Sequence, residues 1–387
     1  MTSYIETPEQ KELRAAVAAL GEKYNYVDYT RPKIKAGEFL TELWDEAGKL
    51  GFLGVNLPEE YGGGGAGIYE LSLVLEELSA AGSGLLLMVV SPAICGTIIS
   101  KYGTEAQKQS WLPRMADGSA TMVFGITEPD AGSNSHKIIT TATRDGSDWI
   151  LNGRKVFISG VDEADAVLIV SRTADNKTGN LKPALFIVPV DTPGFQKVKQ
   201  EMDIHEPNHQ FSLFLDDVRL PADALVGDED AAIAQLFAGL NPERIMGAAM
   251  AVGIGRYAIG RGVEYAKQRQ VWKTPIGAHQ GIAHPLAKAK IEVELARTMA
   301  QKAAALYDAG DEFGAAEAAN MAKYAAAEAS IFALDTAVQT FGGSGLTADV
   351  GLASMLGAAR IARVAPVSRE MIFNFVAQHS LGLPKSY

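Results

Sequence analysis

At 387 residues the chain is too long for one ordinary hydrophobic core, and we expect it to divide into two or three packed units. With 47% hydrophobic and 21% charged residues, its composition excludes a disordered or fibrous protein. The formal net charge of −11 argues against nucleic acid or an anionic membrane as a main partner.

The single cysteine and the first residues indicate a compartment. Cys95 has no second cysteine with which to form an internal disulfide, which fits a reducing cytosol. The sequence MTSYIETPEQ lacks the basic-then-apolar pattern of a signal peptide, and no run reaches the roughly 18 apolar residues of a membrane span. The expectation is a cytoplasmic protein that does not enter membranes.

Residues 1–119 are expected to form a helical unit. Thr7, Pro8 and Gln10 give the pattern of a helix start, with a threonine N-cap and a glutamine three residues later that closes a capping box. Thr104 and Gln107 repeat this pattern further on. Periodic apolar residues predict other helices over residues 39–50, 66–79 and 91–102.

Residues 120–228 are expected to form an antiparallel sheet or barrel. Short apolar runs alternate with turn signals, and no helical pattern separates them. The dipeptides Asp145-Gly146 and Asn152-Gly153 predict two tight hairpin turns. No G-x-G-x-x-G sequence follows any of these strands, so a nucleotide bound as in doubly wound α/β folds is not supported.

Residues 229–387 return to a helical pattern that lasts to the last residue. Long alanine-rich segments such as KAKIEVELARTMAQKAAALYDAG are apolar over much of their circumference, so they must be covered on more than one side. The pattern predicts a four-helix bundle that also buries a face against other subunits. The whole chain is thus expected to be an α+β protein of three domains, 1–119, 120–228 and 229–387.

A polar loop, Thr127 to Ser133, interrupts the first apolar run of the sheet unit. Its hydroxyls, its glycine and its free backbone N–H groups suit a bound phosphate or the polar rim of a flavin ring, although hydroxyl residues are also common in ordinary turns. Phe157 and Ser159 lie two positions apart on a predicted strand and are expected to face the same side. Phe157 would then pack against a flavin or, alternatively, fill the core.

Four motifs in order give a more specific signal. They are FGITEPDAGSN from Phe124, LNGRKVFISG from Leu151, RQVWKTPIGAHQ from Arg269 and QTFGGSG from Gln339. In these motifs and their spacing the chain resembles the acyl-CoA dehydrogenase family over nearly its whole length. The resemblance implies an FAD-dependent enzyme of fatty acid metabolism, a homotetramer built as a dimer of dimers. Such an enzyme converts an acyl-CoA to a trans-2-enoyl-CoA and passes electrons to an electron-transfer flavoprotein.

The resemblance also implies roles for individual residues. Thr127 would contact the flavin ring edge, and Ser133 the flavin pyrophosphate and the neighbouring substrate. The Arg269 and Gln339 motifs would reach the flavin partly across a subunit interface. The residues implied to bind FAD are Phe124, Ile126, Thr127, Ser133, Phe157, Ser159, Arg269, Trp272, His279, Gln280, Gln339, Gly342, Gly343 and Ser368. Those implied to bind the substrate are Ser133, Asn241 and Arg244.

Glu243 is the implied catalytic base. In most of the family a glutamate near the C-terminus removes the pro-R α-proton while the β-hydride passes to flavin N5, but that position falls on Pro366 here. Isovaleryl-type and long-chain-type members place the glutamate immediately before an arginine, as in Glu243-Arg244. From the residues alone, Glu243 next to Pro242 also fits an acid at a helix start that complements the helix dipole.

Three departures from the family pattern leave other activities open. Pro366 has no backbone N–H for the thioester oxygen, Trp272-Lys273 stands where phenylalanine and glycine are usual, and Gly357-Ala358 replaces an arginine-aspartate pair. The alternatives are a flavin-dependent oxidase or monooxygenase-like enzyme, a dehydrogenase linked to acyl-carrier protein, and a non-catalytic homologue. The histidines show no metal-ligand spacing, and no CxxC or HExxH motif occurs, so no metal is expected.

Overall fold

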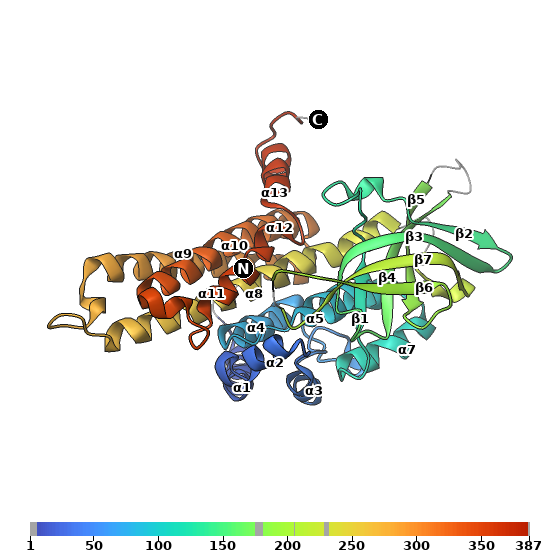
Figure 1. Cartoon of the computed structure of the whole chain (residues 1–387). Coiled ribbons are helices and arrows are strands. Elements are labelled where there is room, and N and C mark those ends of the chain that lie inside the picture. The colour runs from blue at the N-terminus through green and yellow to red at the C-terminus, as the bar shows by residue number, and fades with distance from the viewer. Residues whose placement is uncertain (1–5, 175–180, 205, 228–231, 386–387) are drawn as a thin grey trace.

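The fold is a helical unit, a β-sheet domain and a set of long helices that follow one another along the chain (Figure 1). The structure is a computed structural model, and it describes residues 6–174, 181–204, 206–227 and 232–385. In the view of Figure 1 the sheet lies at one end, the long helices extend to the other, and the N-terminal helices pack below them. The expected α+β architecture is confirmed.

The N-terminal unit is built from several helices, of which α4 is deeply buried. The elements are α1 (Pro8–Lys23), α2 (Arg31–Ala36), α3 (Thr41–Lys49), α4 (Ile68–Ala80), α5 (Leu86–Met88), a π-helix (Val89–Gly96), α6 (Thr97–Tyr102) and α7 (Glu105–Ala116). Both predicted capping boxes form, at Thr7 and at Thr104. The helix predicted over 91–102 is instead a π-helix that contains Pro92, followed by α6.

Over its described residues the sheet domain has eight strands in the order β6-β7-β3-β2-β4-β5-β8, with β1 paired to β4. The strands are β1 (Met122–Gly125), β2 (Thr141–Asp145), β3 (Asp148–Ser159), β4 (Ala166–Ala174), β5 (Leu181–Pro189), β6 (Phe195–Gln200), β7 (Gln210–Leu220) and β8 (Leu225–Val226). Most pairs are antiparallel, but β4 runs parallel to both β1 and β2. The Asp145-Gly146 turn joins β2 to β3 as predicted, with Gly146 at φ 64.

The second predicted turn, Asn152-Gly153, is wrong. β3 continues through these residues and shifts its register against β7 between Leu151 and Gly153. The Asn152 side chain exchanges two hydrogen bonds with Asp217 of β7, both 2.9 Å long, which hold the irregular pair together. Because β3 pairs here with a long partner strand, the Asn-Gly sequence that usually predicts a hairpin turn forms a β-bulge.

A methyl group at Gly153 is expected to destabilise the sheet domain. A Cβ there would lie 2.3 Å from Thr140 Oγ1 and 2.7 Å from Thr140 Cα, so the backbone would have to move. We expect Gly153→Ala to lower the free energy of unfolding by about 1–3 kcal/mol, measured by urea titration. Gly281→Ala is the matched control because nothing lies within 4 Å of its Cβ position in the helix α9 (Gln280–Asp308). Equal losses for the two variants would contradict this account.

The C-terminal unit has three long helices, α8 (Ala232–Gln268), α9 and α10 (Glu312–Phe341). Three short helices, α11 (Leu352–Ala359), α12 (Ile361–Val364) and α13 (Arg369–Phe375), pack on α10, and α13 projects from the bundle (Figure 1). In the part of the chain that is described, no helix is long and apolar enough to cross a membrane.

The predicted helix start at Pro242 is also wrong. α8 begins ten residues earlier, and Pro242 lies inside it. A proline there leaves the carbonyl of Ala238 without its helical N–H donor, and the Tyr307 hydroxyl donates to that carbonyl at 3.0 Å. Because α9 supplies the missing hydrogen-bond donor, α8 can continue through Pro242. The expected domain boundary at 228/229 lies outside the described residues.

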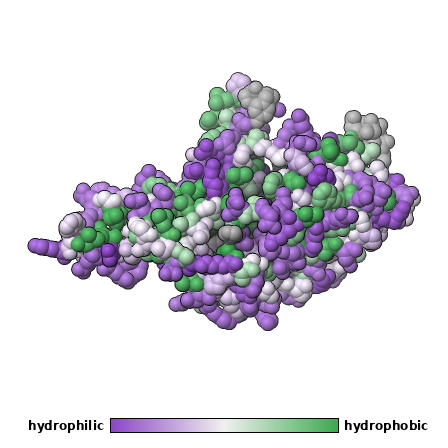
Figure 2. Space-filling model, in the orientation of Figure 1, coloured by the Kyte–Doolittle hydropathy of each residue, from purple (hydrophilic) through white to green (hydrophobic). Residues whose placement is uncertain are grey.

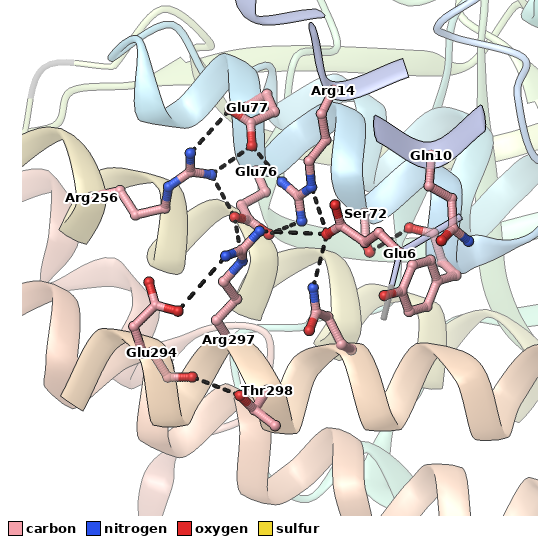
Figure 3. A network of polar contacts seen from close by, with 12 residues as sticks. Glu6, Gln10, Arg14, Ser72, Glu76, Glu77, Arg256, Glu294, Arg297 and Thr298 are labelled. Atoms are coloured by element: carbon pink, nitrogen blue, oxygen red, sulfur yellow. Dashed lines mark hydrogen bonds and ion pairs between the residues drawn. The ribbon is translucent and has the colours of Figure 1, made fainter. Parts of the chain in front are cut away.

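A buried network of charges joins the N-terminal helices to the long ones (Figure 3). Glu76 and Glu77 of α4 meet Arg14 of α1, Arg256 of α8 and Arg297 of α9. Arg14 Nη2 lies 3.1 Å from Glu76, Arg256 Nη1 lies 2.7 Å from Glu77, and Arg297 Nε lies 3.0 Å from Glu76. Four helices are therefore fixed to one another at a single point.

Candidate active site

A buried ion pair fixes the loop that follows β1. Lys155 Nζ lies 2.8 Å from Glu128 and donates to the carbonyl of Ile126 at 3.0 Å. The Glu128 carboxylate also accepts from the backbone N–H groups of Ile139 and Thr140. Burial lowers the pKa of Lys155 to about 8. Burial alone would raise the pKa of Glu128, but the hydrogen bonds from Lys155 and Thr140 lower it. The pair thus holds the loop backbone on both sides of Thr127.

Phe157 points out of the sheet domain beside this loop. The backbone N–H of Val156 donates to the Thr127 carbonyl at 2.9 Å, which joins the loop to β3. Phe157 has φ 57 within a second register shift, and its side chain is 59% exposed. The core-packing alternative for Phe157 is therefore wrong. The bulge also breaks the alternation that was to place Ser159 on the same side, and Ser159 exchanges hydrogen bonds with Gln210 instead.

Thr127 and Ser133 keep hydrogen-bonding capacity for a ligand. Within the described residues, neither one donates a hydrogen bond through its backbone N–H or its hydroxyl. Thr127 is half-buried and Ser133 is exposed, while Phe124 is buried in the core beside them. Free donors next to an exposed aromatic ring fit the polar edge and the flat face of a flavin. The residues present therefore suit FAD.

Glu243 lies half-buried inside α8, not at a helix start, so the helix-dipole alternative is wrong. Burial raises the pKa of its carboxyl to about 7, and the charges of Arg244 and Lys323 act in the opposite direction. Leu240, one turn earlier on α8, packs in the same cluster as Ile126 and Cys95. The turn of α8 that carries Glu243 thus packs against the same apolar cluster as Ile126, in the loop that follows β1.

Pro366 and the predicted substrate residues surround the same stretch of α8. Pro366 Cδ lies 3.8 Å from the Cβ position of Gly247, one helical turn after Glu243. Arg244 is half-buried, and its Nη1 donates to the Oδ1 of buried Asn241 at 3.1 Å. The two glutamate positions used within the resembling family therefore converge on one face of α8.

Seven of the predicted flavin residues lie at the opposite end of the long helices. There, Tyr265 of α8 stacks on Phe341 of α10 with ring centroids 4.1 Å apart. At 1.5 Å per residue, the stretch of α8 from Glu243 to Gln268 is about 37 Å long. One chain does not bring these residues to Thr127 and Phe157. These seven residues form a second group and are all exposed: Arg269, Trp272, His279, Gln280, Gln339, Gly342 and Gly343.

Ser368, the last predicted flavin residue, caps α13. Its Oγ accepts from the backbone N–H of Met371 at 3.3 Å. The preceding carbonyl, of Val367, accepts from the ammonium group of Lys323 on α10. Ser368 therefore lies beside the Lys323 position of α10, about 24 Å along that helix from Gln339 of the second group.

Three family models match the chain in order. They describe the acyl-CoA dehydrogenase N-terminal domain over residues 7–119, the middle domain over 123–218 and the C-terminal domain over 233–381. The chain belongs to the acyl-CoA dehydrogenase family. It is accordingly an oxidoreductase, as the motifs implied.

Individual relatives match this acyl-CoA dehydrogenase along its whole length. Acyl-CoA dehydrogenase FadE12 of Mycobacterium tuberculosis H37Rv is 69% identical over 386 residues, which is 100% of this chain and 99% of that protein. A glutaryl-coenzyme A dehydrogenase in complex with glutaryl-CoA has a TM-score of 0.93 at 28% identity and covers 100% and 98% of the two chains. A Mycobacterium smegmatis glutaryl-CoA dehydrogenase in complex with FADH2 has a TM-score of 0.90 at 28% identity and covers 99% and 96%.

Two buried lysines near the site were not predicted from the sequence. Lys155 and Lys323 are 0% and 3% exposed. A signal for each was present, because Lys155 stands at an inward position of an apolar strand and Lys323 on the alanine stripe of α10. A lysine on a buried face needs a partner, and its position in the sequence does not say which one.

Proposed function

We propose that this acyl-CoA dehydrogenase binds FAD and converts an acyl-CoA to a trans-2-enoyl-CoA, with Glu243 as the base. The observation that carries the proposal is a half-buried carboxyl, with its pKa raised to about 7, on the turn of α8 that packs against the same cluster as Ile126. A base works best when its pKa lies near the working pH, and Glu243 meets that requirement.

The sheet domain supports FAD as the cofactor. Thr127 and Ser133 offer free donors, Phe157 offers an exposed ring, and the Lys155 ion pair keeps the loop rigid. A relative solved with FADH2 supports the same choice. When bound, FAD supplies the acceptor for the substrate's β-hydrogen and its electron pair.

The protein's own residues supply the other half of the reaction. The Glu243 carboxylate removes the pro-R α-proton of the thioester, and its burial strengthens it as a base. Asn241 and Arg244, joined by their hydrogen bond, are assigned to hold the substrate together with Ser133. Because Pro366 has no N–H, the thioester oxygen needs a donor other than the backbone at that position.

Assembly is part of the proposal, because one chain keeps the two groups of flavin residues apart. A second copy would bring its Arg269 group to the Thr127 loop, in a homotetramer. Exposed apolar side chains such as Ile291 and Leu295 on α9 and Phe373 on α13 offer surfaces for that assembly. Apolar residues are also visible on the projecting C-terminal segment in Figure 2. An electron-transfer flavoprotein as acceptor, and the cytoplasm as compartment, complete the proposal.

Anaerobic flavin reduction tests this function. We expect the purified protein to be yellow and to bleach with at least one member of a panel of straight, branched and cyclic acyl-CoAs. Slow recovery in air supports a dehydrogenase, whereas rapid recovery with peroxide would indicate an oxidase. Bleaching only by acyl-carrier-protein thioesters would change the substrate class. A colourless protein that binds no thioester would be a non-catalytic homologue.

A further inference from the structure

Lys323 is a buried cation close to the proposed base. Its side chain is 3% exposed on α10, and its ammonium group donates to the Val367 carbonyl. Burial lowers the pKa of Lys323 to about 8. A buried ammonium group is unfavourable unless a negative charge lies near it, so the identity of that charge is informative.

Contacts place Lys323 against the part of α8 that carries Glu243, which provides that negative charge. Val367, whose carbonyl accepts from Lys323, follows Pro366, and Pro366 Cδ lies 3.8 Å from the Cβ position of Gly247, one helical turn after Glu243.

Two carboxylates act on Lys323, Glu243 and Glu370, and the effect of Glu243 is the larger. Glu370 is exposed and is paired with Arg369 at 2.7 Å. No direct ion pair joins Lys323 to Glu243 among the described contacts, so the two charges act on each other through the low-dielectric interior.

The other groups around Glu243 come from two elements. Arg244 follows it on α8, and its charge lowers the pKa of Glu243 more than Lys323 does. Cys95 of the π-helix faces it with a thiol whose pKa burial and Glu243 both raise, so it adds no charge. Arg244 is already assigned to the substrate and donates to Asn241. Of the two described cations that act on Glu243, Lys323 is the one not assigned to the substrate.

We propose that Lys323 is a positioning residue for the dehydrogenation, whose ammonium group is fixed by the Val367 carbonyl and keeps Glu243 in the carboxylate form that removes the α-proton. This inference rests on the proposed function of Glu243. It assigns to the buried lysine an effect on the ionisation of the base, in addition to its contact with the segment before α13.

The test compares the pH profiles of kcat/KM for the FAD-loaded parent and two variants. Lys323→Met removes the cation, so Glu243 should bind its proton more tightly. We expect the acid limb to move up by about one pH unit, which lowers kcat/KM about tenfold at pH 6 and little at pH 9. Lys323→Arg keeps the charge and should leave the acid limb near the parent's.

Glu328→Gln is the matched control for a purely structural effect, in which α12 and α13 are held less firmly on α10. Glu328 binds Arg363 and Arg369, so its loss loosens α12 and α13 without removing the cation near Glu243. We expect no movement of the acid limb in this variant. A uniform loss of activity at every pH in Lys323→Met, with the acid limb unmoved, would show a merely structural role and overturn the proposal.

A second readout does not need a substrate. The pKa of Glu243 in the folded protein, about 7, lies above the ordinary 4.5. The stability that its proton contributes is full below pH 4.5 and is lost as the pH rises through 7. In Lys323→Met the decline of the thermal midpoint should extend to higher pH. Below pH 8, where Lys323 of the parent keeps its proton, adding Glu243→Gln should abolish the difference. If no thioester bleaches the flavin, the proposed function fails while this thermal result still decides the coupling. A thermal profile identical to the parent's would refute the coupling.

Discussion

Replacing Glu243 with glutamine is expected to leave FAD bound and to slow flavin reduction by about 10²- to 10⁴-fold. The amide has nearly the same shape but cannot accept the α-proton, and a general base contributes about that factor. The measurement is anaerobic stopped-flow reduction with the best acyl-CoA of the panel. In the parent, kcat/KM should fall as the pH drops below about 7, because the proton then occupies the carboxyl group.

Glu264→Gln is the control for this variant. Glu264 lies on the same helix, is exposed and accepts a hydrogen bond from Gln268, so its loss should change the rate less than twofold. Glu243→Asp retains a carboxylate on a shorter side chain and should fall between the parent and the glutamine variant. Reduction of flavin at the parental rate by Glu243→Gln would mean that another group is the base.

Glu76→Gln is expected to lower the free energy of unfolding by about 3–5 kcal/mol. Glu76 meets three arginines from three helices, and its side chain is 5% exposed (Figure 3). With Glu6 and Glu77, it sets three largely buried carboxylates against three guanidinium groups. Glu294 meets Arg297 only at 3.7 Å, from a more exposed position. The amide leaves one positive charge unbalanced in a site with little access to water. Urea unfolding of the FAD-saturated protein, followed by tryptophan fluorescence, measures the loss.

Two further variants show whether the network is responsible. Lys288→Met removes a surface pair with Glu292 on α9, outside the network, and should change the stability by less than about 1 kcal/mol. Combining Glu76→Gln with Arg256→Met restores the balance of charge, so the double variant should lose less stability than the two single losses added together. Strictly additive losses would show that these charges do not act as one network.

The local signals of the sequence predicted structure correctly where neighbouring residues decide it. The Thr7 capping box and the Asp145-Gly146 turn depend on a few consecutive residues, and both form. Asn152-Gly153 and Pro242 failed because distant residues override the local preference. Asp217 holds the first within a strand, and Tyr307 supplies the donor that the second lacks.

The candidate site could be predicted only in part. Family motifs led to Glu243 and to the Thr127 loop, and the structure places the two beside one packed cluster. The charges that act on them could not be found in this way. Lys323 lies 80 positions from Glu243 in the sequence, and no periodic pattern pairs residues on different helices. The same holds for Arg14, Arg256 and Arg297, whose partners are set by how four helices cross.

The unbroken length of α8 has a consequence for variation in this protein. Glu243 and Arg256 lie on one helix. Arg256 pairs with Glu77 of α4, and Pro366 packs near Gly247, one turn after Glu243. Adding or removing one residue between them would rotate one group by about 100° relative to the other. Substitutions can be tolerated along this stretch. An insertion or deletion would instead displace either Glu243 from the active site or Arg256 from its ion pairs with α4. The spacing of thirteen positions should therefore be invariant among functional relatives.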